Sequence, residues 1–273
     1  MEHFESDAGI TLRLETPADH YAVEQMTRDA FWRFWEPDRK ICDEHLLVHR
    51  LRSAPSFLPE LDYIAERNGT LAGHIIYTKS EVLDNDGHAH QVLTFGPLTV
   101  SPKFQNQGIG QALMRHTFAQ AKRLGYRGVL IYGHPDYYPR IGFRPAGEFG
   151  ITTAEGENFD AFMALPLYDN ALEGISGRHD FDSVYKQLTQ EDALEFDRRF
   201  PPREAFAQTP IDVLLNRLDS PARAAMEEQG FQTLEILRAK SQREMAALAG
   251  VDCNAVDTII TVMREHGYRW GGR

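Results

Sequence analysis

The stretch VSPKFQNQGIGQALM, residues 100–114, runs from the end of an apolar strand into the start of a helix. Its two glycines, Gly108 and Gly110, fall at the turn between them. Glycine lets main-chain N–H groups approach a ligand closely, and the unpaired N–H groups at the start of a helix favour an anion. A phosphate-binding turn and a plain tight turn are both open interpretations of this stretch.

Two common phosphate-binding motifs are excluded. The dinucleotide-binding pattern GxGxxG would need a glycine at position 113, which is leucine, and the P-loop pattern GxxxxGK[ST] occurs nowhere in the chain. What remains is a concave series of backbone N–H groups from Gln105 to Gln111 at a helix N-terminus. Such a series suits a pyrophosphate, because the helix dipole adds to the attraction of the N–H groups.

The residues before this stretch predict a mixture of strands and helices. The apolar patterns predict strands at residues 10–15, 62–66, 71–80 and 90–100, and helices at 17–34 and 43–52. Asn68-Gly69 between two of these strands is typical of a hairpin turn. Gly96-Pro97 stands in the middle of the last strand. Because proline cannot donate to a strand ladder, we expect that strand to be irregular there.

The residues after the opening stretch complete one domain. Residues 108–124 predict an amphipathic helix, with Gly125 as the residue that ends it. Its expected apolar face consists of Ile109, Leu113, Met114, Thr117, Phe118, Ala121 and Leu124. Further strands are predicted at residues 129–133, 150–153 and 161–168. Together these elements predict an α/β (α+β) domain over residues 10–170.

Composition and charge limit the classes of function. The chain has 273 residues and a net charge of −11, which argues against a general affinity for nucleic acid or anionic membranes. Cys42 and Cys253 lack the spacing of a zinc site or a disulfide framework, so we expect no metal. The N-terminus has no signal-peptide pattern, and no apolar run reaches the length of a membrane span. We therefore expect a cytoplasmic protein.

Several spaced motifs resemble the GNAT superfamily of acyl-CoA-dependent N-acetyltransferases, in its YhbS-like branch. They are LPELxYIAE at residues 58–66, AGHI at 72–75, GPLTV at 96–100, QNQGIG at 105–110 and GHPxYYPRIGF at 133–143. The resemblance covers roughly residues 10–170. It implies a mixed, splayed β-sheet flanked by helices, with acetyl-CoA as the acyl donor and no metal.

The resemblance also implies roles for individual residues. The loop that holds the coenzyme A pyrophosphate corresponds to Gln105, Asn106, Gln107, Gly108, Ile109, Gly110 and Gln111. Leu98, Thr99 and Val100 would lie along the pantetheine, and the N–H groups of Leu98 and Val100 would pair with it and polarise the thioester carbonyl. Tyr138, four residues before Gly142, matches the tyrosine that protonates the departing thiolate. We expect the adjacent Tyr137 to be a packing residue.

The acceptor side is less clearly marked in the sequence. Candidates for a general base are Glu36, His74, His134 and Asp136. An aromatic run, Phe31, Trp32, Phe34 and Trp35, could line an acceptor pocket through apolar and cation–π contacts. Residues at every step of one run cannot all face the same way, so part of it must belong to the core.

The end of the chain has a different character. Residues 171–209 are interpreted as a linker or extension. In residues 210–273 we expect only short helices, at 211–218, 222–229, 233–238, 242–248 and 254–266. This region is similar to the C-terminal domain of the bacterial RNA polymerase α subunit, an all-α fold with helix-hairpin-helix elements that binds DNA and activators.

The helical region departs from the DNA-binding pattern of that family. Aligned on Gly230, the positions of the family's DNA-contacting arginine and asparagine are Pro221 and Ala224, and the second glycine of the hairpin is Asp252. Residues 211–273 hold nine acidic against eight basic residues, a net charge of −1. We therefore expect a protein contact or a structural role for residues 210–273, and no nucleic-acid partner.

The sequence thus predicts an N-acetyltransferase that moves an acetyl group from acetyl-CoA to a primary amine of a small molecule or peptide, by direct attack in a ternary complex. Two alternatives stay open: a non-catalytic acyl-CoA-binding sensor, and a transcription-associated regulator that acts through the helical region. A homodimer is open as well, and the sequence fixes neither the amine nor the acyl chain length.

Overall fold

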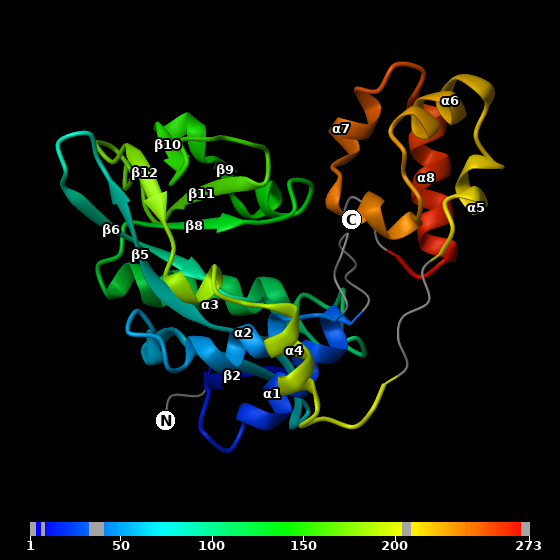
Figure 1. Cartoon of the computed structure of the whole chain (residues 1–273). Coiled ribbons are helices and arrows are strands. Elements are labelled where there is room, and N and C mark those ends of the chain that lie inside the picture. Colours follow the sequence, from blue (N-terminus) through cyan, green and yellow to red (C-terminus); the bar gives the residue numbers. More distant parts are fainter. Residues whose placement is uncertain (1–3, 7–8, 33–40, 204–208, 269–273) are drawn as a thin grey trace. The chain divides into compact units, whose positions relative to one another are not determined.

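The computed structural model describes residues 4–6, 9–32, 41–203 and 209–268 (Figure 1). The chain forms two compact units. Within the described ranges, the first unit runs to Pro202 except for the segment Gly133–Ile141, and the second joins that segment to the residues from Arg203 onward. Among the described residues, no helix is both long and apolar enough to cross a membrane.

The first unit contains a five-stranded sheet, here called sheet A, in which all neighbouring strands are antiparallel. Its order is β1 (Phe4–Ser6), β2 (Ile10–Leu14), β3 (Tyr63–Arg67), β4 (Thr70–Ile75) and β7 (Thr99–Val100). The predicted hairpin is confirmed, because β3 and β4 are joined by Asn68 and Gly69, whose φ angles of 51° and 72° are both positive.

A second sheet, sheet B, has seven strands. Its order is β10 (Ile151–Thr153), β12 (Gly177–Asp180), β5 (Tyr77–Leu83), β6 (Ala89–Phe95), β8 (Gly128–Tyr132), β11 (Phe162–Pro166) and β9 (Arg144–Pro145). The strands predicted at 129–133, 150–153 and 161–168 are confirmed as β8, β10 and β11, with ends shifted by one or two residues. The sheet mixes parallel and antiparallel neighbours, which agrees with the expected α/β class.

At two places the chain passes from one sheet to the other without an intervening helix. The prediction of one strand over residues 71–80 is wrong, since β4 ends at Ile75 in sheet A and β5 begins at Tyr77 in sheet B. The irregularity predicted at Gly96-Pro97 is confirmed, since β6 ends at Phe95 in sheet B and β7 begins at Thr99 in sheet A. Both changes occur at one level, because the N–H of Gly96 donates to the carbonyl of Ile76 at 2.8 Å.

Helices cover the two faces of sheet A. On one face lie α1 (His20–Phe31) and α2 (Glu44–Leu51), where Val23 and Val48 pack against Ile64 of β3. The predicted helix at residues 43–52 is confirmed by α2. The one predicted at 17–34 begins later, at His20, and its last two residues lie outside the described part.

The opposite face of sheet A is covered by α3 (Ile109–Arg123), the helix predicted at residues 108–124. A Cβ at Gly73 of β4 would lie 2.8 Å from Ile109 and 3.0 Å from Leu113, so the close approach of α3 to the sheet requires glycine there. Most of the expected apolar face is buried, but Leu124 is 49% exposed. The positive φ of Gly125, 88°, confirms that it ends the helix.

The first unit extends beyond the boundary expected near residue 170. Strand β12 lies between β10 and β5 in sheet B, so the segment interpreted as a linker contributes to the sheet. After it come a 3₁₀ turn, η4 (Ser183–Tyr185), and α4 (Gln190–Asp197), whose Phe196 packs beside Leu46 of α2. The sequence did not predict β12, because its four residues, GRHD, have no alternating apolar pattern.

The helical part of the second unit has its own core. Its elements are α5 (Asp212–Leu215), α6 (Ser220–Glu228), η5 (Leu234–Ala239), α7 (Gln242–Ala246) and α8 (Cys253–Glu265). All five predicted helices are therefore present, the third as a 3₁₀ helix. The core consists mainly of Leu214, Met226, Leu234, Leu237, Met245, Ile259, Val262 and Met263.

Candidate active site

Strand β7 and the residue before it carry the N–H groups of Leu98 and Val100, which are expected to bind the acyl donor. The N–H of Ser101 donates to the carbonyl of Ala72 at 2.9 Å, so in this antiparallel pair residues 99 and 101 direct their N–H groups toward β4. The N–H groups of Leu98 and Val100 therefore point the other way, and β7 is the last strand of sheet A on that side. Two donors of one strand edge thus face away from the sheet.

A buried contact with α1 fixes the position of β7, and the strand before β7 separates from its own neighbour. The hydroxyl groups of Thr99 and Thr27 of α1 are 3.0 Å apart and fully buried. In sheet B, the parallel pairing of β6, the strand before β7, with β8 is limited to a single pair, Leu93 opposite Val129. The two strands of the central ladder therefore separate before Gly96, which is the splay that the sequence resemblance implied.

The loop after β7 leads directly into α3. Asn106 and Gly108 adopt left-handed backbone conformations, with φ angles of 66° and 81°, and Gly108 is the N-cap of the helix. Its lack of a side chain leaves the first N–H groups of α3 without a side-chain cap. Gln105, Asn106, Gln107 and Gly108 are exposed, whereas Ile109 and Gly110 are buried in the first helical turn. The turn thus presents uncapped N–H groups at the surface.

A cation missed by the sequence reasoning lies beside this loop. The guanidinium group of Arg67, at the end of β3, donates to the side-chain carbonyl of Gln107. Arg67 lies forty residues before Gln107, and only the pairing of β3 in the sheet brings the two together. The uncapped helix start and this arginine form a site suited to an anion such as a pyrophosphate.

Tyr138 lies in the segment that belongs to the second unit. It opens η2 (Tyr138–Ile141), and its ring contacts that of Tyr137 edge to face, with centroids 5.0 Å apart. Burial raises the pKa of the Tyr138 phenol above its ordinary value of about 10. The hydroxyl is therefore protonated at neutral pH and can serve as a proton donor.

Two of the candidate bases, His134 and Asp136, are held by the helical part of this unit. The backbone N–H of Gln242, the first residue of α7, donates to the Asp136 carboxylate at 2.9 Å. The ring of His134 hydrogen-bonds the backbone of Arg238, and burial lowers the pKa of His134. Both side chains thus have structural partners within their own unit.

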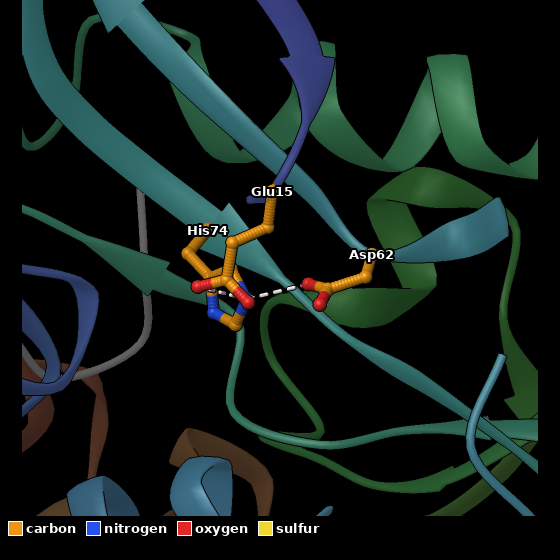
Figure 2. Close-up of side chains that lie close together, drawn as sticks. All are labelled: Glu15, Asp62 and His74. Atoms are coloured by element: carbon orange, nitrogen blue, oxygen red, sulfur yellow. Dashed lines mark hydrogen bonds and ion pairs between the residues drawn. The ribbon is translucent and has the colours of Figure 1, made fainter. Parts of the chain in front are cut away.

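A third candidate base, His74, belongs to a buried cluster of charged groups. Figure 2 shows its ring facing Asp62 and Glu15, which come from the turn before β3 and from the end of β2. The ring Nε2 is 2.8 Å from Asp62 and 3.8 Å from Glu15. His74 is fully buried, so it has no access to a bound substrate.

Burial governs the protonation of this cluster. It lowers the pKa of His74 to about 4 and raises that of Asp62 to about 6, and it raises the pKa of Glu15 as well. Arg52, directly after α2, compensates the carboxylates, with 2.7 Å contacts to Glu15 and to Glu24. Three such ligands could hold a metal ion, but Arg52 already supplies the positive charge. The cluster therefore joins α1 and α2 to sheet A.

The remaining acceptor-side candidates divide in two. Phe31 and Trp32 pack against the core formed by Cys42, Leu46 and Ala193, so this half of the aromatic run belongs to the interior. Phe34, Trp35 and Glu36 lie outside the described residues. The described part of the run therefore supplies no acceptor pocket.

Known proteins resemble the first unit. Residues 24–143 match the profile of the acetyltransferase (GNAT) family. The N-acetyltransferase YhbS of Escherichia coli K12 is 28% identical over 179 residues, which cover 66% of this chain and all of YhbS. The first unit is thus similar to the GNAT acetyltransferase family, and these similarities support an N-acetyltransferase.

Two solved structures have the same fold. The crystal structure of E. coli YhbS in complex with CoA superimposes with a TM-score of 0.56 at 24% identity, over 69% of this chain and 98% of YhbS. A GNAT family acetyltransferase from Brucella melitensis in complex with acetyl-CoA has a TM-score of 0.51 at 25% identity, over 64% of this chain and 97% of its own. The splayed α/β fold predicted from the sequence is thus confirmed.

The structural role of the buried cluster leads to a first prediction. In an Asp62→Ala variant, the buried Nε2 of His74 loses its hydrogen bond, so we expect the free energy of unfolding in urea to fall by about 1–3 kcal/mol. The matched Asp62→Asn variant keeps a hydrogen-bonding group at the same place and should lose much less. A stable Asp62→Asn protein without acetyltransferase activity would contradict a purely structural role.

Proposed function

We propose that the protein transfers an acetyl group from acetyl-CoA to a primary amine by direct attack in a ternary complex. The observation that carries the proposal is the outward edge of β7, with the N–H groups of Leu98 and Val100, placed directly before the uncapped start of α3. Acetyl-CoA is favoured as donor because the related Brucella melitensis protein was solved with it.

The donor would bind along this stretch in two parts. Its pyrophosphate would lie on the N–H groups from Gln105 to Gln111, with Arg67 adding a positive charge. Its pantetheine would run beside Leu98, Thr99 and Val100 and pair with the strand edge. An N–H group there would also hydrogen-bond the thioester carbonyl and stabilise the negative charge that develops on its oxygen.

The transfer step needs one proton to leave and one to arrive. The neutral amine nitrogen attacks the thioester carbon, a C–N bond forms, and the C–S bond breaks. The amine gives up its proton to water or to a base, for which Glu36, His134 and Asp136 stay proposals. We assign the proton taken up by the departing thiolate to the Tyr138 hydroxyl, because its raised pKa keeps it protonated.

We propose that the helical part of the second unit positions the segment that carries Tyr138. It resembles the C-terminal domain of the RNA polymerase α subunit in its sequence pattern, and its α7 binds Asp136, two residues before Tyr138. This contact favours a role in holding the segment that carries the tyrosine, rather than one in nucleic-acid binding. We also propose that residues 210–273 bind a protein partner. The protein would form a homodimer and lie in the cytoplasm.

The proposed pyrophosphate site can be tested with a charge change. An Arg67→Gln variant removes the cation beside Gln107, so we expect the Kd for acetyl-CoA, measured by isothermal titration calorimetry, to rise about three- to tenfold. Arg123→Gln at the far end of α3 is the matched control and should leave the Kd unchanged. Equal affinity of both variants for acetyl-CoA would argue against the site.

The role of Tyr138 can be tested by removing one hydroxyl group. In Tyr138→Phe we expect kcat for thiol release to fall about tenfold or more, with little change in the KM for acetyl-CoA, because the hydroxyl acts only in the chemical step. The neighbouring Tyr137→Phe should retain its kcat. Full activity of Tyr138→Phe would remove this residue from the mechanism.

A further inference from the structure

Sheet B has a second face that the donor site does not use. The side chains of Tyr77 and Phe95 point toward α3, where the Tyr77 hydroxyl is 2.8 Å from that of Thr117. Because side chains alternate along a strand, Thr78 and Thr94 point to the opposite face. A row of aromatic rings lies on that face, contributed by four separate segments: Tyr132, Phe159, Phe181 and Tyr185.

Tyr132, the last residue of β8, is the centre of this row. Its ring centroid lies 5.4 Å from that of Phe159 and 4.7 Å from that of Phe181. Beneath it, the ring of the buried Phe162 is 5.2 Å away. Tyr132 and Phe159 are 52% and 45% exposed, although large aromatic side chains gain free energy by burial. The row thus offers the faces and edges of three rings to a ligand.

The inner end of the row reaches the point where β6 leaves sheet B. The rings of Phe181 and Tyr185 are 5.7 Å apart, and the Tyr185 hydroxyl is 3.2 Å from that of Thr78. The same hydroxyl would lie 3.6 Å from a Cβ at Gly96. Leu93 is paired with Val129 in parallel, so Gly96 and Tyr132 each lie three residues beyond that pair, at the same register position. The inner end of the row therefore lies beside the splay, on the face opposite α3.

The charges around the row are mainly negative, with three carboxylates and one lysine, Lys186. Together with burial, Glu155, Asp180 and Glu157 raise the pKa of the Tyr132 phenol to about 12. Asp180 is paired with Lys186 at 2.5 Å. Glu155 and Glu157 are exposed and form no ion pair with any residue in the described ranges. Aromatic rings beside free carboxylates attract a cation, and a tetraalkylammonium or guanidinium group most of all.

From this arrangement we infer that the acceptor amine carries a second, cationic group, which binds on Tyr132, Phe159 and Phe181 while the reacting nitrogen extends toward Gly96. The inference rests on the proposed acetyl transfer and names its class of substrate. The nucleophile must be neutral to attack, so a molecule with two nitrogens serves both ends: one free amine for the chemistry and one permanent charge for recognition.

The test uses two amines that differ only in charge. One is an aminobutyl trimethylammonium ion and the other its neutral tert-butyl isostere, each assayed for acetyl-CoA-dependent thiol release and for acetylated product. We expect kcat/KM for the cationic amine to exceed that for the isostere at least about tenfold. In a Tyr132→Leu/Phe159→Leu variant the ratio should fall to about threefold or less. Tyr168→Leu, another exposed aromatic at the opposite end of sheet B, is the matched control and should keep the ratio.

Two outcomes would overturn the inference. One is an equal or better kcat/KM for the neutral isostere, and the other is an unchanged ratio in the double variant, whose folding is checked by thermal melting. If neither amine is acetylated, calorimetry with the cationic amine decides: binding that the double variant loses supports the inference, and no binding contradicts it. Failure of the proposed donor site would look different, since acetyl-CoA itself would then fail to bind.

Discussion

One local constraint, the passage of the chain from sheet B to sheet A at Gly96-Pro97, determines the rest of the first unit. Proline has no N–H to offer a ladder, and a side chain at Gly96 would meet Leu51 at 2.5 Å and Ile76 at 3.1 Å. The central strand can therefore neither continue in sheet B nor be displaced outward. It pairs with β8 at Leu93, leaves the sheet, and pairs again with β4 at Thr99.

The two faces of the fold acquire different chemistry from this break. Toward α3, the edge of β7 leads into an uncapped helix start with Arg67 beside it, which suits a phosphate-bearing donor. On the opposite face, Tyr132, Phe159 and Phe181 form a ring surface among carboxylates, which suits a cation.

The sequence was informative wherever local rules decide the structure. Helix α3, its end at Gly125 and the Asn68-Gly69 hairpin follow from apolar spacing and backbone conformation within a few residues. The break at Gly96-Pro97 was predictable for the same reason. Strand β12 was not predictable, because its four residues lack an apolar pattern and form a strand only through pairing with β5 and β10.

The candidate site was predictable in part, since its proposed donor half is one continuous stretch from residue 98 to 111. The position of Arg67 depends on the pairing of β3, and the aromatic row gathers residues from four segments between 132 and 185. His74 looked like a candidate base because the sequence does not reveal its burial beside Asp62, Glu15 and Arg52. Contacts between distant segments arise from tertiary structure, and no local pattern encodes them.

The central claim is that the outward N–H groups of Leu98 and Val100 bind the acyl donor. Amide hydrogen exchange at these two residues, resolved by NMR with and without saturating acetyl-CoA, tests it most directly. We predict rapid exchange in the free protein and at least about tenfold slower exchange with acetyl-CoA, while Thr99, whose N–H points to β4, is protected in both states. Unchanged exchange of Leu98 and Val100 in protein saturated with acetyl-CoA would contradict the account.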